Sequence, residues 1–291
     1  MNQASHILGI NRFSDLNHSE YVQKIGKNQQ STKRQLGENI KYQKHHEFKK
    51  ELMSSMYGSG LPMYYNWNDR KAVSPVHDNL NCEHAHWAFA VADVIASTAF
   101  IQNNGAFGQV ELETLSAQQL IDCMPDQGKW PGCTYNADFN QAFEYVKQNG
   151  LYSEEDYPFT GTKNDCKDID SKKVVMINSY TLVSISDPSS MIEAVFRNPI
   201  VAEIDPSSQL MQMYKSDVIN SQECGQDAWH KVLIVGWGIN EKNEYWIVKN
   251  SWGTDWGEQG YAKIAMVDGP GICGIQLSPY SVDIGPFKNK L

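Results

Sequence analysis

From Asn79 to Phe89 the chain reads NLNCEHAHWAF, and this stretch opens a long apolar helix predicted over residues 87–102. Apolar residues recur along it at i, i+4, i+7 and i+8, the spacing of one buried helix face: Trp87, Val91, Val94 and Ile95. The first turn of a helix offers free backbone N–H groups and the positive end of the helix dipole, which stabilise a thiolate nucleophile. The residue at that point is His86, which carries no thiol.

Two strand-like runs further along the chain carry a histidine and an asparagine. The first run is WHKVLIVGWG from Trp229 to Gly238, and the second is YWIVKNSWG from Tyr245 to Gly253. A histidine base oriented by an amide is the arrangement that activates a thiol nucleophile. His230 and Asn250 are therefore candidates for a base and its orienting group.

With these motifs, the chain resembles the papain-like (cathepsin-type) cysteine peptidases from about Leu61 to the C-terminus. The resemblance implies an α+β fold of two lobes, a helical left lobe and a β-barrel right lobe, with a cleft between them. In that family the residue before Trp-Ala-Phe is the catalytic cysteine, and Cys-Gly-Ser precedes it. This chain has CEHAH from Cys82 to His86, which is one residue longer and lacks the nucleophile.

The resemblance also divides the chain. Residues 61–291 are predicted to form the papain-like domain, and residues 1–60 a truncated inhibitory pro-segment with a linker. The sequence GINRFSD from Gly9 to Asp15 resembles the Gly-x-Asn-x-Phe-x-Asp motif late in the pro-segment of the family, without the two long helices expected before it. Residues 28–50 are polar and basic, typical of a surface linker, with some helix predicted around residues 42–52. We expect the segment to stay attached, because a chain without a nucleophile cannot cut itself.

Helices are predicted in the first half of the papain-like domain and mostly strands in the second, typical of an α+β protein. Besides the long helix, shorter helices are expected at residues 115–123, 136–148 and 187–197. Runs rich in Val, Ile, Tyr and Trp predict strands over residues 174–183, 200–205, 229–239, 244–250 and 261–267.

Composition excludes several classes of function. The 291 residues are 41% hydrophobic and carry a formal net charge of −9, so the chain is globular and acidic. No stripe rich in Lys and Arg offsets the acid excess, which argues against binding to nucleic acid or an anionic membrane. No apolar run approaches a transmembrane span, and the first ten residues lack the pattern of an export signal. We expect no nucleic acid, no membrane span and no cofactor.

The sequence has six cysteines, and their spacing alone does not choose among the possible pairings. The family resemblance implies three disulfides: Cys82–Cys133, Cys123–Cys166 and Cys224–Cys273. That pairing leaves no thiol to act as a nucleophile and favours an oxidising compartment, secretory or lysosomal. The alternative is reduced, buried cysteines in a cytoplasmic protein or a larger intracellular assembly, which the missing export signal favours.

Two of the four parts of the family's active site match this chain. His230 takes the position of the base and Asn250 that of its orienting residue; without a thiol, the two could persist as a hydrogen-bonded pair beneath Trp252. His86 holds the nucleophile position. Asn79 holds the position of the oxyanion glutamine, and its side chain is one methylene shorter.

The substrate cleft departs from the family as well. Tyr135 and Asn136 replace two glycines against whose backbone a peptide would lie. Glu203 and Lys231 stand at specificity-pocket positions that are small or apolar in the family, and Trp229 precedes the histidine where a smaller residue is usual. We predict that Glu203 and Lys231 form a buried ion pair that plugs the pocket, since a lone buried charge is costly. An exposed surface pair of little energetic weight is the alternative.

The sequence thus predicts a catalytically inactive papain-like peptidase homologue that acts as a structural or protein-binding module for an unidentified protein partner. One alternative is an active cysteine-type peptidase or hydrolase with an unconventional nucleophile such as His86. Another is a metal-binding module using His84, His86 and His230 with Glu83, because three histidines and a carboxylate can bind zinc.

Overall fold

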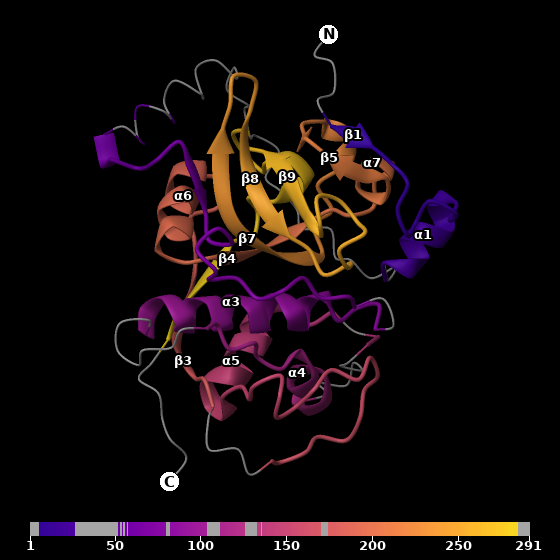
Figure 1. Cartoon of the computed structure of the whole chain (residues 1–291), viewed down its shortest axis with the longest axis vertical. Helices are drawn as coiled ribbons and strands as arrows, with labels where there is room; N and C mark the ends of the chain where they lie inside the picture. The colour runs from indigo at the N-terminus through magenta and orange to yellow at the C-terminus, as the bar shows by residue number, and fades with distance from the viewer. Residues whose placement is uncertain are drawn as a thin grey trace.

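A computed structural model describes residues 6–26, 52, 54, 56, 58–79, 82–103, 111–125, 133–134, 136–169 and 174–284. Most strands gather in one lobe, and α3 (His86–Asn103) lies along the boundary between it and a second, helical lobe (Figure 1). The two-lobe α+β architecture predicted from the sequence is confirmed. Within the described residues, no helix combines the length and the apolar character that a membrane crossing requires.

The helical lobe packs α4 (Ala117–Cys123) and α5 (Phe139–Asn149) beneath α3. Residues 86–99 of α3 are buried on every side, since the helix is enclosed by both lobes and not only along the one predicted face. The two shorter helices begin later than the predicted residues 115 and 136. Ser116 caps α4 by accepting a hydrogen bond from the Gln119 backbone N–H, and Asp138 caps α5 in extended conformation.

The other lobe is built on an eight-stranded sheet in the order β3-β10-β4-β7-β8-β9-β6, with β2 also paired to β7. Its strands are β2 Tyr64–Asn66, β3 Ile177–Leu182, β4 Ile200–Ile204, β6 Val218–Ile219, β7 His230–Ile239, β8 Glu244–Lys249, β9 Tyr261–Ala265 and β10 Tyr280–Ile284. The helix α6 (Pro188–Arg197) begins after Asp187, whose carboxylate accepts from two backbone N–H groups. The short helix α7 (Gln209–Gln212) precedes β5 (Tyr214–Ser216), and two 3-10 turns complete the lobe at Gln222–Cys224 and Ile272–Gly274.

The described residues form two large hydrophobic cores, and they meet at strand β7. Val232 and Ile234 contribute to the core inside the sheet, whereas Leu233 and Val235 contribute to the core beneath α3. Alternate side chains of a strand point to opposite faces, so a run buried on both faces must be apolar throughout. Packing on both faces therefore holds the start of β7 in place at the boundary between the lobes.

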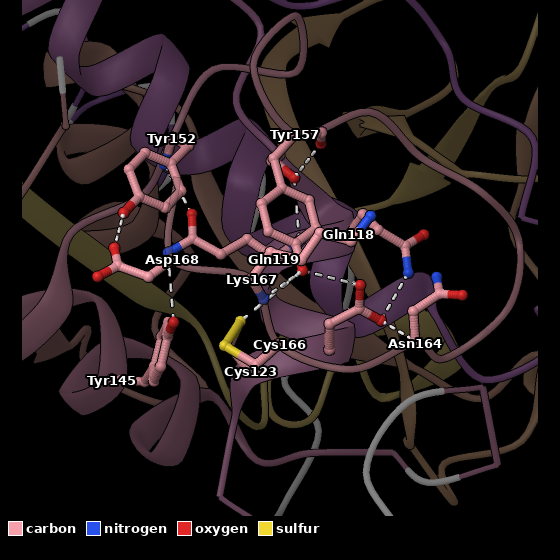
Figure 2. Close-up of a disulfide and its surroundings, with 12 residues drawn as sticks. Gln118, Gln119, Cys123, Tyr145, Tyr152, Tyr157, Asn164, Cys166, Lys167 and Asp168 are labelled. Carbon is pink, nitrogen blue, oxygen red and sulfur yellow. Dashed lines mark hydrogen bonds between the residues drawn. A yellow bond between two sulfur atoms is a disulfide. The ribbon is translucent and has the colours of Figure 1, made fainter. Parts of the chain in front are cut away.

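All six cysteines are paired, in the three combinations implied by the resemblance: Cys82–Cys133, Cys123–Cys166 and Cys224–Cys273. Figure 2 shows the second bridge, which joins the end of α4 to an exposed loop. Beside it the Tyr157 hydroxyl donates to the Asp122 carboxylate at 3.0 Å, and the same carboxylate accepts from the Asn164 backbone N–H at 2.7 Å. This loop is thus held by both a covalent and a polar anchor.

A buried charge network also ties the two lobes together. Lys249 at the end of β8 donates to the Asp93 carboxylate of α3 at 2.6 Å and to the Ser74 hydroxyl at 2.9 Å. Burial alone would raise the pKa of Asp93, yet the Lys249 ammonium and His77 hold it at about 2. No pattern in the sequence predicts this network.

Residues 6–26 pack against the barrel lobe (Figure 1). Here β1 (Ile7–Leu8) pairs with β5, and α1 (His18–Lys24) begins with a capping box formed by Asn17 and Glu20. Of the predicted helix around residues 42–52, all but Leu52 lies outside the described residues. The described residues at 52, 54, 56, 58 and 59 are helical.

The centre of this contact is Phe13, which is 1% exposed. Its ring meets the edges of Tyr21 and Trp252, with centroids 5.2 Å and 5.3 Å away. Arg12 forms an ion pair with Asp78 at 2.9 Å and donates to the Trp252 carbonyl. The motif that resembles the pro-segment thus contacts Trp252, which lies in the strand-like run from Tyr245 to Gly253.

Candidate active site

The three candidate residues His86, His230 and Asn250 meet at the boundary between the lobes, where all of them are buried. His86 is the first residue of α3, and His230 is the first residue of β7. Their ring centroids lie 4.3 Å apart. The structure therefore brings the nucleophile position next to the base position.

His230 and Asn250 form the expected hydrogen bond. His230 Nε2 lies 2.8 Å from Asn250 Oδ1, which also accepts from the Ser251 backbone N–H. The ring of Trp252 covers His230 with centroids 4.7 Å apart. Because a carbonyl oxygen only accepts, Nε2 carries the proton, and the lone pair of neutral His230 lies on Nδ1. Burial, with a smaller contribution from the Lys231 charge, lowers the pKa of His230 to about 3 even though the Asn250 hydrogen bond opposes the shift.

His86 is held in one tautomer by the neighbouring strand. Its Nδ1 accepts a hydrogen bond from the Lys231 backbone N–H at 3.0 Å, so the proton of the neutral ring lies on Nε2. Burial first, and then the charges of His230 and Lys231, hold the pKa of His86 well below its usual value. The lone pair of neutral His86 is therefore engaged by the Lys231 N–H, and Nε2 carries the proton.

Asn79 does not serve as an oxyanion donor in this arrangement. With its amide oriented so that both polar atoms are satisfied, the amide nitrogen donates to the Ser251 carbonyl at 2.6 Å. The amide oxygen accepts from the His86 backbone N–H at 3.2 Å. One side-chain N–H of Asn79 and the backbone N–H at the start of α3 are thus engaged. An oxyanion hole needs free donors aimed at the reacting oxygen.

Lys231 and Glu203 form the predicted ion pair. Lys231 Nζ lies 2.9 Å from the Glu203 carboxylate, and both side chains are buried. The two residues are register partners on β7 and β4. The same ammonium donates to Asn136 Oδ1 at 2.8 Å and lies 5.2 Å from the centre of the Phe139 ring. The pair is therefore a buried one and not an exposed surface pair.

The proposed metal ligands do not converge. Glu83 pairs with Lys24 at 3.7 Å, and the His84 ring lies against Gly26, where an added Cβ would be 2.7 Å away. Within the described part of the chain, no group of three His, Cys, Asp or Glu side chains is arranged to hold a metal ion. The lone pair of neutral His86 is also engaged, because Nδ1 accepts from the Lys231 backbone N–H.

Sequence reasoning missed part of this site. Asn136 was expected only to fill space, but its Nδ2 donates to the Trp229 carbonyl at 2.6 Å. The Trp229 ring itself lies 5.8 Å from His86, between centroids. No pattern in the sequence indicates that Asn136 and Trp229, 93 residues apart, are joined by a hydrogen bond from a side-chain amide. Tyr135, the other predicted cleft residue, lies outside the described residues.

Comparison with known proteins is consistent with this geometry. A sequence model of the papain family cysteine proteases matches residues 61–282. The chain is 34% identical over 291 residues to the probable cysteine protease RDL6 of Arabidopsis thaliana, a match covering 98% of this chain and 74% of that protein.

Two solved structures of precursor forms match as well. They are the proform of the ragweed pollen allergen Amb a 11 (TM-score 0.78, 28% identity) and the recombinant precursor of stem bromelain (TM-score 0.77, 32% identity). Each match covers 98% of this chain, with 84% and 85% of the respective solved chains. On its sequence and its fold, this chain belongs to the papain family of cysteine proteases.

Proposed function

We propose that this protein is a catalytically inactive member of its family that serves as a structural or protein-binding module. One observation carries the proposal: all six cysteines are in disulfides, so no thiol is present to attack a peptide bond. The residue at the nucleophile position, His86, is buried and hydrogen-bonded through Nδ1. Covalent catalysis in this fold depends on a thiolate that the base can activate.

A second candidate is a hydrolase that uses His86 as its nucleophile, and the intact His230–Asn250 pair favours it. The tautomer argues against it. An imidazole attacks through a lone pair, and the His86 lone pair accepts from the Lys231 N–H while Nε2 holds the proton. Attack would require breaking that bond inside a buried site, so the inactive reading has the stronger support.

The proposal also includes residues 1–60 as a permanent part of the protein. Phe13 and Arg12 anchor the described part of this segment to the barrel lobe, and Ile25 and Tyr21 belong to the same buried cluster. In a chain without a nucleophile, self-cleavage cannot release such a segment. A module of this kind acts through what it contacts, so its role is to present surfaces and not to turn over substrate.

The test is hydrolysis of a mixed library of peptides by the wild type and by His86→Cys, with His84→Cys as a matched control that places a thiol two residues away. We expect no turnover above buffer in any of the three. In His86→Cys the Asn79 amide stays bonded to the Ser251 carbonyl and to the backbone N–H of residue 86, two groups that an oxyanion hole would need free and aimed at the substrate. Turnover by the wild type that is lost in His230→Ala would overturn the proposal.

A further inference from the structure

Asn136 lies on the helical-lobe side of the cleft and contacts two residues on the barrel side. Its Nδ2 donates to the Trp229 carbonyl at 2.6 Å, and its Oδ1 accepts from Lys231 Nζ at 2.8 Å. The orientation of this amide is fixed by chemistry, because a carbonyl only accepts and an ammonium only donates.

The acceptor of the first hydrogen bond is the backbone carbonyl of Trp229. The backbone N–H of Trp229 donates to the Ile204 carbonyl, so this residue is aligned with the strand pair β4–β7. Its carbonyl directly precedes His230, and the donor to it is the amide of Asn136 from the helical lobe. A main-chain carbonyl at the start of a strand can also accept an N–H from an extended peptide that binds alongside it.

The side chain of Asn136 has the chemistry of a peptide unit: a planar amide with one carbonyl oxygen and N–H donors. It supplies the N–H that a bound peptide would give to Trp229, and its oxygen accepts from the Lys231 ammonium, which is paired with Glu203. A peptide main chain cannot donate to the same Trp229 carbonyl from the same side while this amide is in place.

Both ends of this contact are rigid. On the helical side, Asn136 follows Cys133, whose disulfide with Cys82 ties it to the start of α3, and the next helix begins at Phe139. On the barrel side, Lys231 is held by Glu203 and by its backbone bond to His86. Ordering the amide therefore costs little additional conformational entropy.

We propose that the Asn136 carboxamide is a built-in substitute for a bound peptide, a latch that joins the two lobes and excludes extended peptides from the cleft. The latch concerns peptide binding and not bond cleavage, so it stands or falls independently of the proposed lack of catalysis. It follows that a protein partner of this chain binds outside the cleft.

The first test is binding of a fluorescent, blocked peptide of three leucines to the full chain, measured by anisotropy. Asn136→Gly removes the carboxamide, and Asn178→Gly, whose amide bonds Asp283 on the far strand β10, is the matched control. We expect Asn136→Gly to bind at least about tenfold more tightly than the wild type and the control. Equal binding by all three, or none in any of them, would overturn the latch.

The second test is a double-mutant cycle in the folding equilibrium, with Asn136→Ala and Lys231→Met singly and together. The two side chains are in direct contact across the lobes, so their effects should not multiply. We expect a coupling of about tenfold in the folding equilibrium constant. A coupling factor of one would mean that the amide does not join the lobes, and the proposal would fail.

Discussion

The two walls of the cleft differ in how their polar groups are used. On the barrel wall, His230, Asn250 and Trp252 keep the geometry of an oriented base, with a 2.8 Å hydrogen bond under an aromatic ring. On the helical wall, His86 and Asn79 turn their polar groups to bonds within the protein.

The comparison shows that the shape of an active centre and its chemistry are separable. The hydrogen bond between the buried side chains of His230 and Asn250 holds them together as a pair, whether or not a nucleophile faces them. A donor that should stay free for a substrate has no such support, because it gains stability by bonding inside the protein. On the helical wall, the Asn79 amide and the His86 backbone N–H are bonded within the protein in this way.

The largest expected effect comes from breaking the charged link between the walls. Lys231→Ala leaves Glu203 buried and unpaired, and we expect a loss of about 3–5 kcal/mol in the free energy of unfolding. The double variant with Glu203→Ala should recover part of this loss. Urea denaturation followed by tryptophan fluorescence measures both.

The matched control for this prediction is Lys263→Ala, which breaks an ion pair of 2.7 Å with Glu258 where both side chains are about one-third exposed. Screening by water limits the contribution of such a pair to below about 1 kcal/mol. If Lys231→Ala and Lys263→Ala lower the free energy of unfolding by the same amount, the buried ion pair contributes no more than an exposed one. The contrast between the two walls is then weakened.

A second, smaller effect concerns the anchoring of the N-terminal segment to the barrel wall. Phe13→Ala removes a ring that is 1% exposed and meets Tyr21 and Trp252, so about 3 kcal/mol of docking free energy should be lost. We expect the segment to become sensitive to trypsin while the rest of the chain resists.

Ile10→Ala is the control for this experiment, since Ile10 is 87% exposed and its truncation leaves no cavity. Unchanged resistance in Phe13→Ala would mean that other contacts, such as those of Arg12, suffice to hold the segment.

The smallest effect is a dependence of stability on pH. Burial lowers the pKa values of His86 and His230 in the folded state, the latter to about 3, against an unfolded value of about 6.5. The unfolded chain therefore binds more protons in acid. The stability that each neutral histidine contributes is fully present above about pH 6.5 and is lost as the pH falls toward its folded pKa; down to pH 5 the loss is at most about 2 kcal/mol for each histidine.

His86→Gln should reduce this slope between pH 6.5 and 5, whereas His18→Gln, at an exposed position, should leave it unchanged. The measurement is the urea midpoint at a series of pH values. A slope that is the same in His86→Gln and the wild type would show that His86 takes up its proton as easily folded as unfolded.

Much of this fold was predictable because its signals are local or come from the family resemblance. The long helix from His86 and the strand from His230 have apolar patterns that extend over many residues, and the resemblance implied all three disulfides. Predicted helix starts were early at residues 115 and 136, because capping by Ser116 and Asp138 decides the first turn.

The unpredicted features depend on contacts between distant parts of the chain. Strand β1 has only two residues, too few to show periodicity, and it forms because β5 lies beside it. The charge of Lys249 is buried only because Asp93, 156 residues away, meets it. Likewise, the sequence marked Asn136 as a departure from glycine, but its two hydrogen-bonding partners depend on how the lobes meet.

The three disulfides have a consequence for the chemical environment in which the protein can persist. A cysteine protease has to keep one sulfur reduced, so alkylating agents and mild oxidants inactivate it. Here every sulfur of a cysteine is already consumed in a bridge. Reagents directed at free thiols find no target on the folded chain, and its surfaces stay the same under oxidising conditions that would inactivate a thiol-dependent relative.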